Sequence, residues 1–331
     1  MQMEQLIQNF PNQIKRAIEI GESAQINSSS VSFNHIFISG LGGSGIGGTI
    51  FSQIVADELS IPILVNKDYS LPAYIGEKSL VIICSYSGNT EETLEVLRKA
   101  KDKAGKIICI TSGGAILDFA KENNYDYIVI DGGMPPRSCF AYSFVQLFYV
   151  LNGLGLINAD FKIKLEKSAA LLLSEQHEIK TLANQMAIDL KDSIPVIYSD
   201  ASYEGVGIRF RQQINENSKM LCWHHVIPEM NHNELVGWRG NYPNVKAVFL
   251  RNESDFIRNQ ERMEFLKEVI EPYCAGIFEI HSKGESNIER TFYLIHFVDW
   301  ISQYLGIMNG FDTAEIDVIN KLKGSLAANP L

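Results

Sequence analysis

The feature that most constrains the fold of this chain is a regular alternation of short apolar runs with longer helical patterns. Runs that are this short and rich in Ile, Val and Phe predict buried strands. Strands that alternate with helices imply β–α–β units, and hence a mostly parallel sheet with helices on both faces. We therefore predict an α/β fold. The runs cover residues 35–40, 61–66, 79–85, 106–112, 125–131, 194–199, 220–227, 245–251 and 275–281.

The second half of the sequence repeats the layout of the first. Each half ends in an aromatic-rich apolar helix pattern, "SFVQLFYVLNGLGLI" and "TFYLIHFVDWISQYLGIM", and residues 161–190 form a long helical pattern between them. The 331 residues are enough for two cores, because domains usually hold about 100–200 residues. We predict two tandem domains of similar build, residues 1–155 and residues 156–331, packed tightly because no low-complexity linker separates them.

Charge and cysteine content narrow the classes of partner. The formal net charge of -10 repels a polyphosphate backbone, so we expect no nucleic acid as a partner, and no polybasic run is present for an anionic membrane. The first ten residues, "MQMEQLIQNF", lack the pattern of a secretion signal. Five widely spaced cysteines, mostly within apolar runs, indicate buried thiols in a reducing cytoplasm.

One uncharged stretch, residues 138–159, is long enough to span a bilayer. Ser143, Gln146 and Asn152 interrupt it, Gly153 ends the helical pattern early, and no basic flank orients it. We predict a buried helix, or a helix at a subunit interface.

A glycine-rich loop, "SGLGGSGIGG", follows the first predicted strand. The glycines Gly40, Gly42 and Gly45 match G-x-G-x-x-G, and Asp68 follows the second strand, where a ribose-binding acid belongs in a dinucleotide fold. A close strand–helix turn explains the same pattern equally well. The helix that follows is expected from about Gly47 to Glu58.

A second loop, "SYSGNTEE", follows the third predicted strand and is rich in hydroxyls. Ser85, Ser87 and Thr90 crowd a turn at a helix N-terminus, where free N–H groups and the helix dipole favour an anion. A helix cap would account for one hydroxyl, whereas a single phosphate held between this loop and Ser44 would use all of them.

With these two loops the chain resembles the sugar isomerase (SIS) domain, and over nearly its whole length it resembles the bifunctional phosphoglucose/phosphomannose isomerase family, which has two SIS-like domains. Four further segments carry the resemblance: "MPPRSCFAY" (134–142), "INENSK" (214–219), "PEMNHNELVGW" (228–238) and "INKLKGSL" (319–326). The resemblance implies that Gly43, Ser44, Ser85, Ser87 and Thr90 bind the phosphate of a sugar 6-phosphate.

The resemblance also implies an activity, the interconversion of glucose 6-phosphate and mannose 6-phosphate with fructose 6-phosphate through a cis-enediol. Glu216 is then the base that shuttles the proton, Arg137 stabilises the enediolate, and His232 opens the sugar ring. Lys323 assists at the ring oxygen, with Lys321 as the other candidate. The family further implies a homodimer in which His232 crosses the interface, and a reaction that needs no cofactor or metal.

Competing interpretations remain at this stage. A non-catalytic phosphosugar-binding regulator needs the phosphate loops alone, and a nucleotide-dependent oxidoreductase needs only the glycine loop. Glu216, Arg137 and His232 each have an ordinary structural reading as a solvated acid, a surface ion pair and a helix cap. Cys222, His224, His225 and His232 are metal-ligand types close in sequence, but their spacing matches no zinc motif, so we expect no metal.

Overall fold

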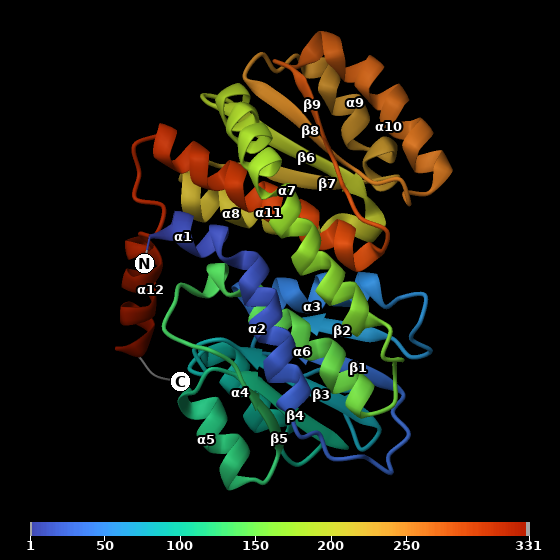
Figure 1. Cartoon of the computed structure of the whole chain (residues 1–331), viewed down its shortest axis with the longest axis vertical. Helices are drawn as coiled ribbons and strands as arrows, with labels where there is room; N and C mark the ends of the chain where they lie inside the picture. Colours follow the sequence, from blue (N-terminus) through green and yellow to red (C-terminus); the bar gives the residue numbers. More distant parts are fainter. Residues whose placement is uncertain (1, 329–331) are drawn as a thin grey trace.

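A computed structural model describes residues 2–328 and contains two parallel sheets, one above the other in Figure 1. The first sheet has the strand order β2-β1-β3-β4-β5, and all its neighbouring strands pair in parallel. Its strands are β1 (His35–Ser39), β2 (Ile63–Asn66), β3 (Ser79–Ser85), β4 (Lys106–Thr111) and β5 (Asp126–Val129).

The second sheet has the order β7-β6-β8-β9 and is also parallel throughout. Its strands are β6 (Ile194–Asp200), β7 (Trp223–Ile227), β8 (Val245–Arg251) and β9 (Ile277–His281). In the register of this sheet, Ile197 of β6 lies between His224 of β7 and Val248 of β8. The predicted α/β class and every predicted strand are confirmed, with bounds that differ by at most a few residues.

Helices cover both sheets, as the alternation predicted. They are α1 (Met3–Gln8), α2 (Phe10–Ser23), α3 (Gly42–Ile54), α4 (Glu91–Ala100), α5 (Gly114–Glu122), α6 (Phe140–Gly153), α7 (Phe161–Leu190), α8 (Glu204–Gln213), α9 (Glu234–Gly237), α10 (Ile257–Ile270), α11 (Asn287–Met308) and α12 (Asp317–Ala327). The predicted connector 161–190 is the single helix α7, which crosses from the lower to the upper sheet (Figure 1). The helical segment at the N-terminal end of the described chain is divided at Asn9 into α1 and α2.

The two halves share one hydrophobic core. Phe144 of α6 contacts Phe292 of α11 edge to face, with ring centroids 5.5 Å apart. Gln53 of α3 donates to the carbonyl of Ala201 and accepts from the amide of Gly205, each at 2.9 Å, so polar bonds also join the halves. The expectation of tight packing is confirmed, while the boundary between residues 155 and 156, in the loop from α6 to α7, stays a prediction.

The uncharged stretch forms α6 and is already covered within one chain. All residues of α6 from Phe140 to Leu151 are buried, and the Gln146 side chain donates to the Ala17 carbonyl of α2 at 2.9 Å. The alternative that this helix lies at a subunit interface is therefore wrong, because α2, α3 and α11 cover its surface. Within residues 2–328, no helix combines the length and the apolar character that a membrane crossing requires.

Candidate active site

The glycine-rich loop turns directly into α3, which starts at Gly42 and not near Gly47 as predicted. Glycine is required there because α3 lies against its own strand: a Cβ at Gly45 would stand 2.3 Å from the Gly40 carbonyl oxygen. Gly43 lies beside Pro136: a Cβ at Gly43 would stand 3.4 Å from the Pro136 carbonyl oxygen. Ser44 is buried, and its hydroxyl bonds no protein group within residues 2–328. The first turn of α3 thus offers free N–H groups and one free hydroxyl next to the segment that carries Arg137.

The hydroxyl-rich loop lies beside it, because β1 and β3 are parallel neighbours whose carboxyl ends share one edge of the sheet. The hydroxyls of Ser85 and Thr90 are 2.9 Å apart, and the Gly88 amide donates to Ser85 at 3.2 Å. Thr90 occupies the N-cap position of α4, yet its side chain makes no capping bond. Ser87 is exposed and accepts from the Asn89 amide at 3.3 Å. The Ser85 and Thr90 hydroxyls therefore meet at the start of α4, and neither Thr90 nor Ser87 caps that helix.

Arg137 lies in a one-turn helix (Pro136–Ser138) and is only 4% exposed. Its Nε donates to Asn217 Oδ1 at 2.7 Å and one Nη to the Thr313 carbonyl at 2.5 Å. The other Nη lies 3.5 Å from a carboxylate oxygen of Glu216. Burial lowers the pKa of Arg137, and the charge of Glu216 opposes that shift. Arg137 and Glu216, predicted to act together, are thus neighbours, and the reading of Arg137 as a surface ion pair is wrong.

Glu216 lies in a π-helical turn (Ile214–Ser218) that continues α8, and its side chain is 31% exposed. Single π turns widen a helix locally and often occur at functional sites. Here both Glu216 and Asn217, which are consecutive in the turn, contact Arg137. Two consecutive side chains of a regular α-helix would not be expected to face the same group. Lys219, directly after the turn, donates to the Glu216 carbonyl at 2.6 Å.

A buried polar layer supports Arg137 from behind. Arg209 of α8 donates to the Arg137 carbonyl at 3.1 Å and to Asp299 of α11 at 2.6 Å. Gln213 donates to the second oxygen of Asp299 at 2.9 Å. Burial raises the pKa of Asp299, and Arg209 opposes the shift. Sequence reasoning missed this layer, as well as Asn217 and the Thr313 carbonyl; only the place of Asn217 next to Glu216 gave any signal.

His232 and the C-terminal lysines lie apart from this cluster within the chain. His232 is exposed, in a short helical turn (Glu229–His232), and across residues 2–328 its side chain makes no hydrogen bond or ion pair. It does not cap α9, because the Asn233 side chain accepts from the Glu234 amide instead. Lys321 and Lys323 lie on α12, a helix with no buried residue in the described part of the chain.

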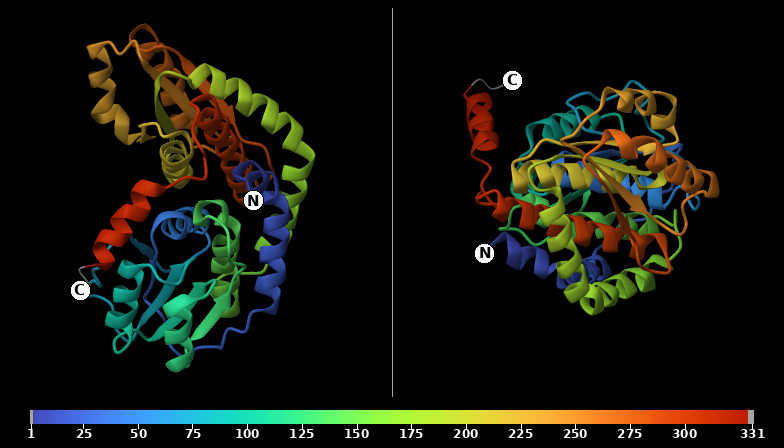
Figure 2. Two further views of the ribbon diagram at one scale, coloured as in Figure 1. Left: turned by 90° about the vertical axis from the view of Figure 1, so that its left-hand side faces the viewer. Right: turned by 90° about the horizontal axis from the view of Figure 1, so that it is seen from above.

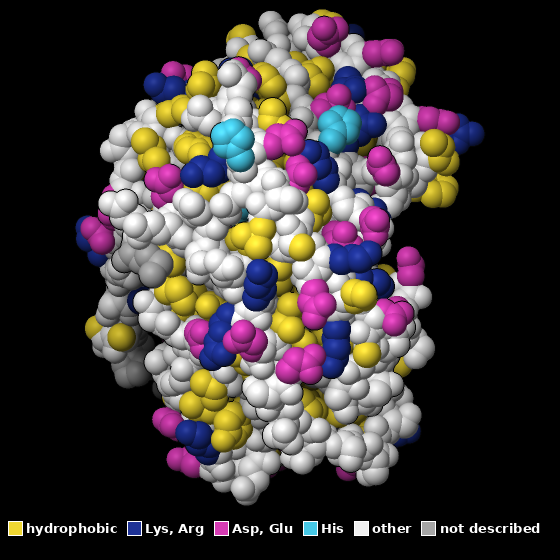
Figure 3. Space-filling model, viewed as in Figure 1, with side chains coloured by type: hydrophobic (Ala, Val, Ile, Leu, Met, Phe, Trp, Pro, Cys, Tyr) yellow, Lys and Arg dark blue, Asp and Glu magenta, His cyan; other side chains and the backbone are white. Residues whose placement is uncertain are grey.

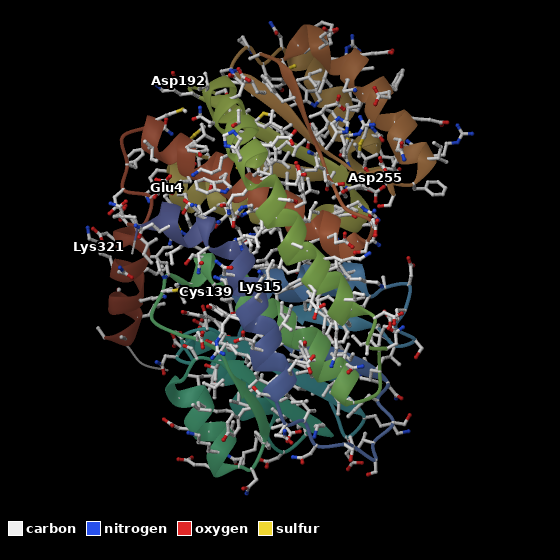
Figure 4. All side chains as sticks on the ribbon, in the orientation of Figure 1. Glu4, Lys15, Cys139, Asp192, Asp255 and Lys321 are labelled. Atoms are coloured by element: carbon white, nitrogen blue, oxygen red, sulfur yellow. The ribbon has the colours of Figure 1, made fainter. Side chains whose placement is uncertain are left out.

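The helix α12 projects from the body of the molecule (Figure 2). Figure 4 shows Lys321 at the outer edge of the molecule, whereas Cys139, two residues after Arg137, lies in its interior. Hydrophobic atoms stand uncovered at the edge where α12 lies (Figure 3). On α12 itself, Val318 is 78% exposed and Leu322 is 60% exposed.

The cysteine and histidines near β7 have separate partners. His224 Nε2 lies 3.8 Å from a Glu204 oxygen, and His225 Nδ1 lies 3.0 Å from a Glu234 oxygen. Burial, with the charge of Arg211 adding to it, lowers the pKa of His224 to about 4, while burial raises the pKa of Cys222 to about 12. His232 does not join these side chains, and residues 2–328 contain no group of three or more His, Cys, Asp or Glu placed to hold a metal ion.

Comparisons with known proteins agree with this architecture. A family model described as the SIS domain matches residues 31–130, and one described as the bacterial phospho-glucose isomerase C-terminal SIS domain matches residues 179–326. Each matched region contains one of the two sheets. The C-terminal domain of glucosamine-fructose-6-phosphate aminotransferase from Francisella tularensis has the same fold, with a TM-score of 0.77, 15% identity, and coverage of 95% of this chain and 98% of that chain.

Relatives of known function match almost end to end. A bifunctional phosphoglucose/phosphomannose isomerase of Caldicellulosiruptor bescii is 38% identical over 335 residues, which cover 98% of this chain and 99% of that protein. The protein of the same name from Aquifex aeolicus is 34% identical over 299 residues, which cover 89% of this chain and 91% of that protein.

Proposed function

The chain belongs to the bifunctional phosphoglucose/phosphomannose isomerase family, and we propose that the cluster around Arg137 is its active site. The protein is an aldose–ketose isomerase that interconverts glucose 6-phosphate and mannose 6-phosphate with fructose 6-phosphate. A non-catalytic regulator would need the phosphate loops but no proton-transferring carboxylate.

The single observation that carries the site assignment is the pairing of Arg137 with Glu216 next to the phosphate loops. Isomerisation moves one proton between C1 and C2 of the open sugar, and one carboxylate can take and return it. Glu216 is partly exposed and is free to meet the sugar, while Arg137 is buried and fixed by Asn217 and the Thr313 carbonyl. A fixed guanidinium stabilises the enediolate oxygen without having to reorganise during the reaction.

The phosphate of the substrate binds between the two loops in this proposal. Gly43 supplies its amide and Ser44 its hydroxyl from the first turn of α3, and the loop before α4 supplies Ser85, Ser87 and Thr90. Support comes from the shared sheet edge, the uncapped start of α4 and the unpartnered Ser44 hydroxyl. A dianion there meets two helix N-termini at once.

Ring opening is assigned to His232, with Lys323 or Lys321 at the ring oxygen. We place His232 in the active site of a second copy of the chain, so that the enzyme is a homodimer with shared sites. Three features support this arrangement: His232 is exposed, its side chain has no partner in the described residues, and α12 shows an uncovered apolar face. We also assign the enzyme to the cytoplasm, because all five cysteines are unpaired.

A coupled assay of the purified chain on fructose 6-phosphate and mannose 6-phosphate, with EDTA present, tests the function. We expect turnover of both substrates, because the proposed chemistry needs only side chains. Binding of both sugars without turnover would point to a phosphosugar sensor. Turnover of one sugar alone would restrict the specificity to that substrate.

A further inference from the structure

Lys219 has a backbone conformation that lysine rarely adopts. Its φ of 55° and ψ of 37° place it in the left-handed region directly after the π turn that holds Glu216. Glycine adopts this conformation at the lowest cost, and Asn tolerates it better than Lys. A lysine in this conformation indicates that interactions of its side chain offset the backbone strain.

The Lys219 ammonium joins two segments that are far apart in sequence. It donates to the carbonyl of Glu216 at 2.6 Å, to that of Glu315 at 2.7 Å, and to that of Asp312 at 3.2 Å. These carbonyls match the three donors of an ammonium group. A carboxylate oxygen of Glu315 lies 3.6 Å from the Lys219 Nζ and partly balances the positive charge of the ammonium.

Arg137 holds the same C-terminal segment through the Thr313 carbonyl. Two cations therefore bind three main-chain carbonyls, those of Asp312, Thr313 and Glu315, just before α12 begins at Asp317. Since no described residue of α12 is buried, these bonds are the nearest anchors that set where the helix starts. Movement of the Glu216 turn and of α12 is thereby coupled.

We propose that Lys219 is a positioning residue that holds the Glu216 turn and the segment 312–315 in one fixed arrangement. The proposal rests on the proposed function for its kinetic consequence. When the ammonium is lost, Glu216 is no longer held in a fixed position relative to α12 and its lysines, Lys321 and Lys323. The proposed phosphate loops stay intact. The loss therefore affects turnover and spares substrate binding.

Two variants suited to the backbone test this: Lys219→Gly and Lys219→Asn remove the ammonium and relieve the left-handed strain. Asp192→Gly is the matched control, since Asp192 is another non-glycine residue with positive φ (58°) and lies at the far end of the molecule (Figure 4). For both Lys219 variants we expect kcat to fall between about tenfold and a hundredfold with KM within about twofold, as misplaced catalytic groups do. Amide hydrogen exchange in residues 309–327 should rise at least about tenfold, with the rest of the chain unchanged.

The exchange measurement does not depend on activity, so it separates this proposal from the assignment of the active site. Faster exchange confined to residues 309–327 supports the coupling even if Glu216 proves not to be the base. Unchanged exchange in both Lys219 variants overturns the proposal. A rise in KM alone overturns it too, because that would place Lys219 in substrate binding.

Discussion

At the residue scale, the different roles proposed for Arg137 and Glu216 follow from their burial. Arg137 is 4% exposed and makes two short hydrogen bonds, so it acts as a fixed charge. The Glu216 side chain is 31% exposed and approaches Arg137 at 3.5 Å without a tight bidentate contact. A base has to reach the substrate, whereas a stabilising cation has to stay in place.

Replacing Glu216 with Gln keeps its shape and removes the base. We expect Glu216→Gln to lower kcat by at least about a hundredfold while KM changes little, because only the proton transfer is lost. Exchange of the substrate C2 hydrogen with solvent deuterium, followed by NMR, should stop as well. Glu253→Gln, at an exposed acid in the second half, is the control and should behave as wild type. Near-normal turnover of Glu216→Gln would remove Glu216 from the mechanism.

The proposed phosphate loops are tested by a change at Ser87, which is exposed, so that its truncation should leave the fold intact. A hydrogen bond to a charged group contributes about 1.5–3 kcal/mol, so Ser87→Ala should raise KM between about tenfold and a hundredfold. Competitive inhibition by inorganic phosphate should weaken in parallel. Ser174→Ala on α7 is a control, since that hydroxyl bonds only its own helix. If neither KM nor phosphate inhibition changed, the Ser87 hydroxyl would have no role in binding.

At the scale of elements, the two sheets end in opposite chemistry. The carboxyl ends of β1 and β3 carry glycines and hydroxyls, while the corresponding ends of β6 and β8 lead to Asp200 and Asp255, each at most 5% exposed. The Asn252 amide donates to Asp255 at 3.0 Å, and Asn259 donates to Asp200 at 2.7 Å. Carboxylates at the second edge would repel a phosphate, in keeping with the proposal that the phosphate binds at the loops of the first domain.

Burial raises the pKa of Asp255 to about 6, and the charge of Asp200 adds to the shift. Since an unfolded Asp has a pKa near 4, the folded chain retains this proton over a range where the unfolded chain has lost it. The stabilisation is complete below about pH 4 and disappears as the pH rises through 6. Relative to Asp255→Asn, the wild-type free energy of unfolding should fall by about 2–3 kcal/mol between pH 4 and pH 7.

Urea denaturation of wild type and Asp255→Asn at several pH values measures this difference. Asp192→Asn changes an exposed acid and should follow the wild-type pH profile. Parallel pH profiles for wild type and Asp255→Asn would show that Asp255 titrates normally in the folded chain.

At the scale of the whole molecule, the proposed groups fall into two sets. Arg137, Glu216 and the phosphate loops lie together between the two domains, whereas His232 lies on the second domain with no link to them in the described chain. A dimer that completes the site predicts complementation between two inactive variants. Mixing Glu216→Gln with His232→Ala chains should restore about one quarter of wild-type activity, because half of randomly mixed twofold dimers contain one intact site.

Mixing Glu216→Gln with Arg137→Lys chains is the matched control for complementation. Both residues belong to the same site of one chain, so no mixed dimer contains an intact site and no activity should return. Absence of rescue in mass-verified mixed dimers of the first pair would mean that one chain builds each site alone. His232→Ala should also act far more strongly on cyclic substrate than on open-chain substrate, and equal losses would exclude a role in ring opening.

The strands, the positions of the glycine-rich and hydroxyl-rich loops, and the long helix α7 could be predicted from the sequence, because their signals are local. An apolar run such as residues 79–85 has to be buried, and 161–190 has apolar spacing along its whole length. The predicted start of α3 was wrong because it also rested on a local signal. Glycines lower helix propensity, so the pattern predicted a start near Gly47, whereas the helix starts at Gly42. The close approach of α3 to β1 overrides that propensity.

Only the tertiary structure decided which distant residues meet. Arg137 and Asn217 are 80 positions apart, and Arg137 and Thr313 are 176 apart, so no local pattern indicates that one guanidinium binds both. The Thr313 and Glu315 acceptors are main-chain carbonyls, which every residue has and which therefore leave no mark in a sequence. The resemblance of motifs led to the proposed catalytic residues, and the packing of α8, α11 and the C-terminal segment around Arg137 determines how Arg137 and Glu216 are held.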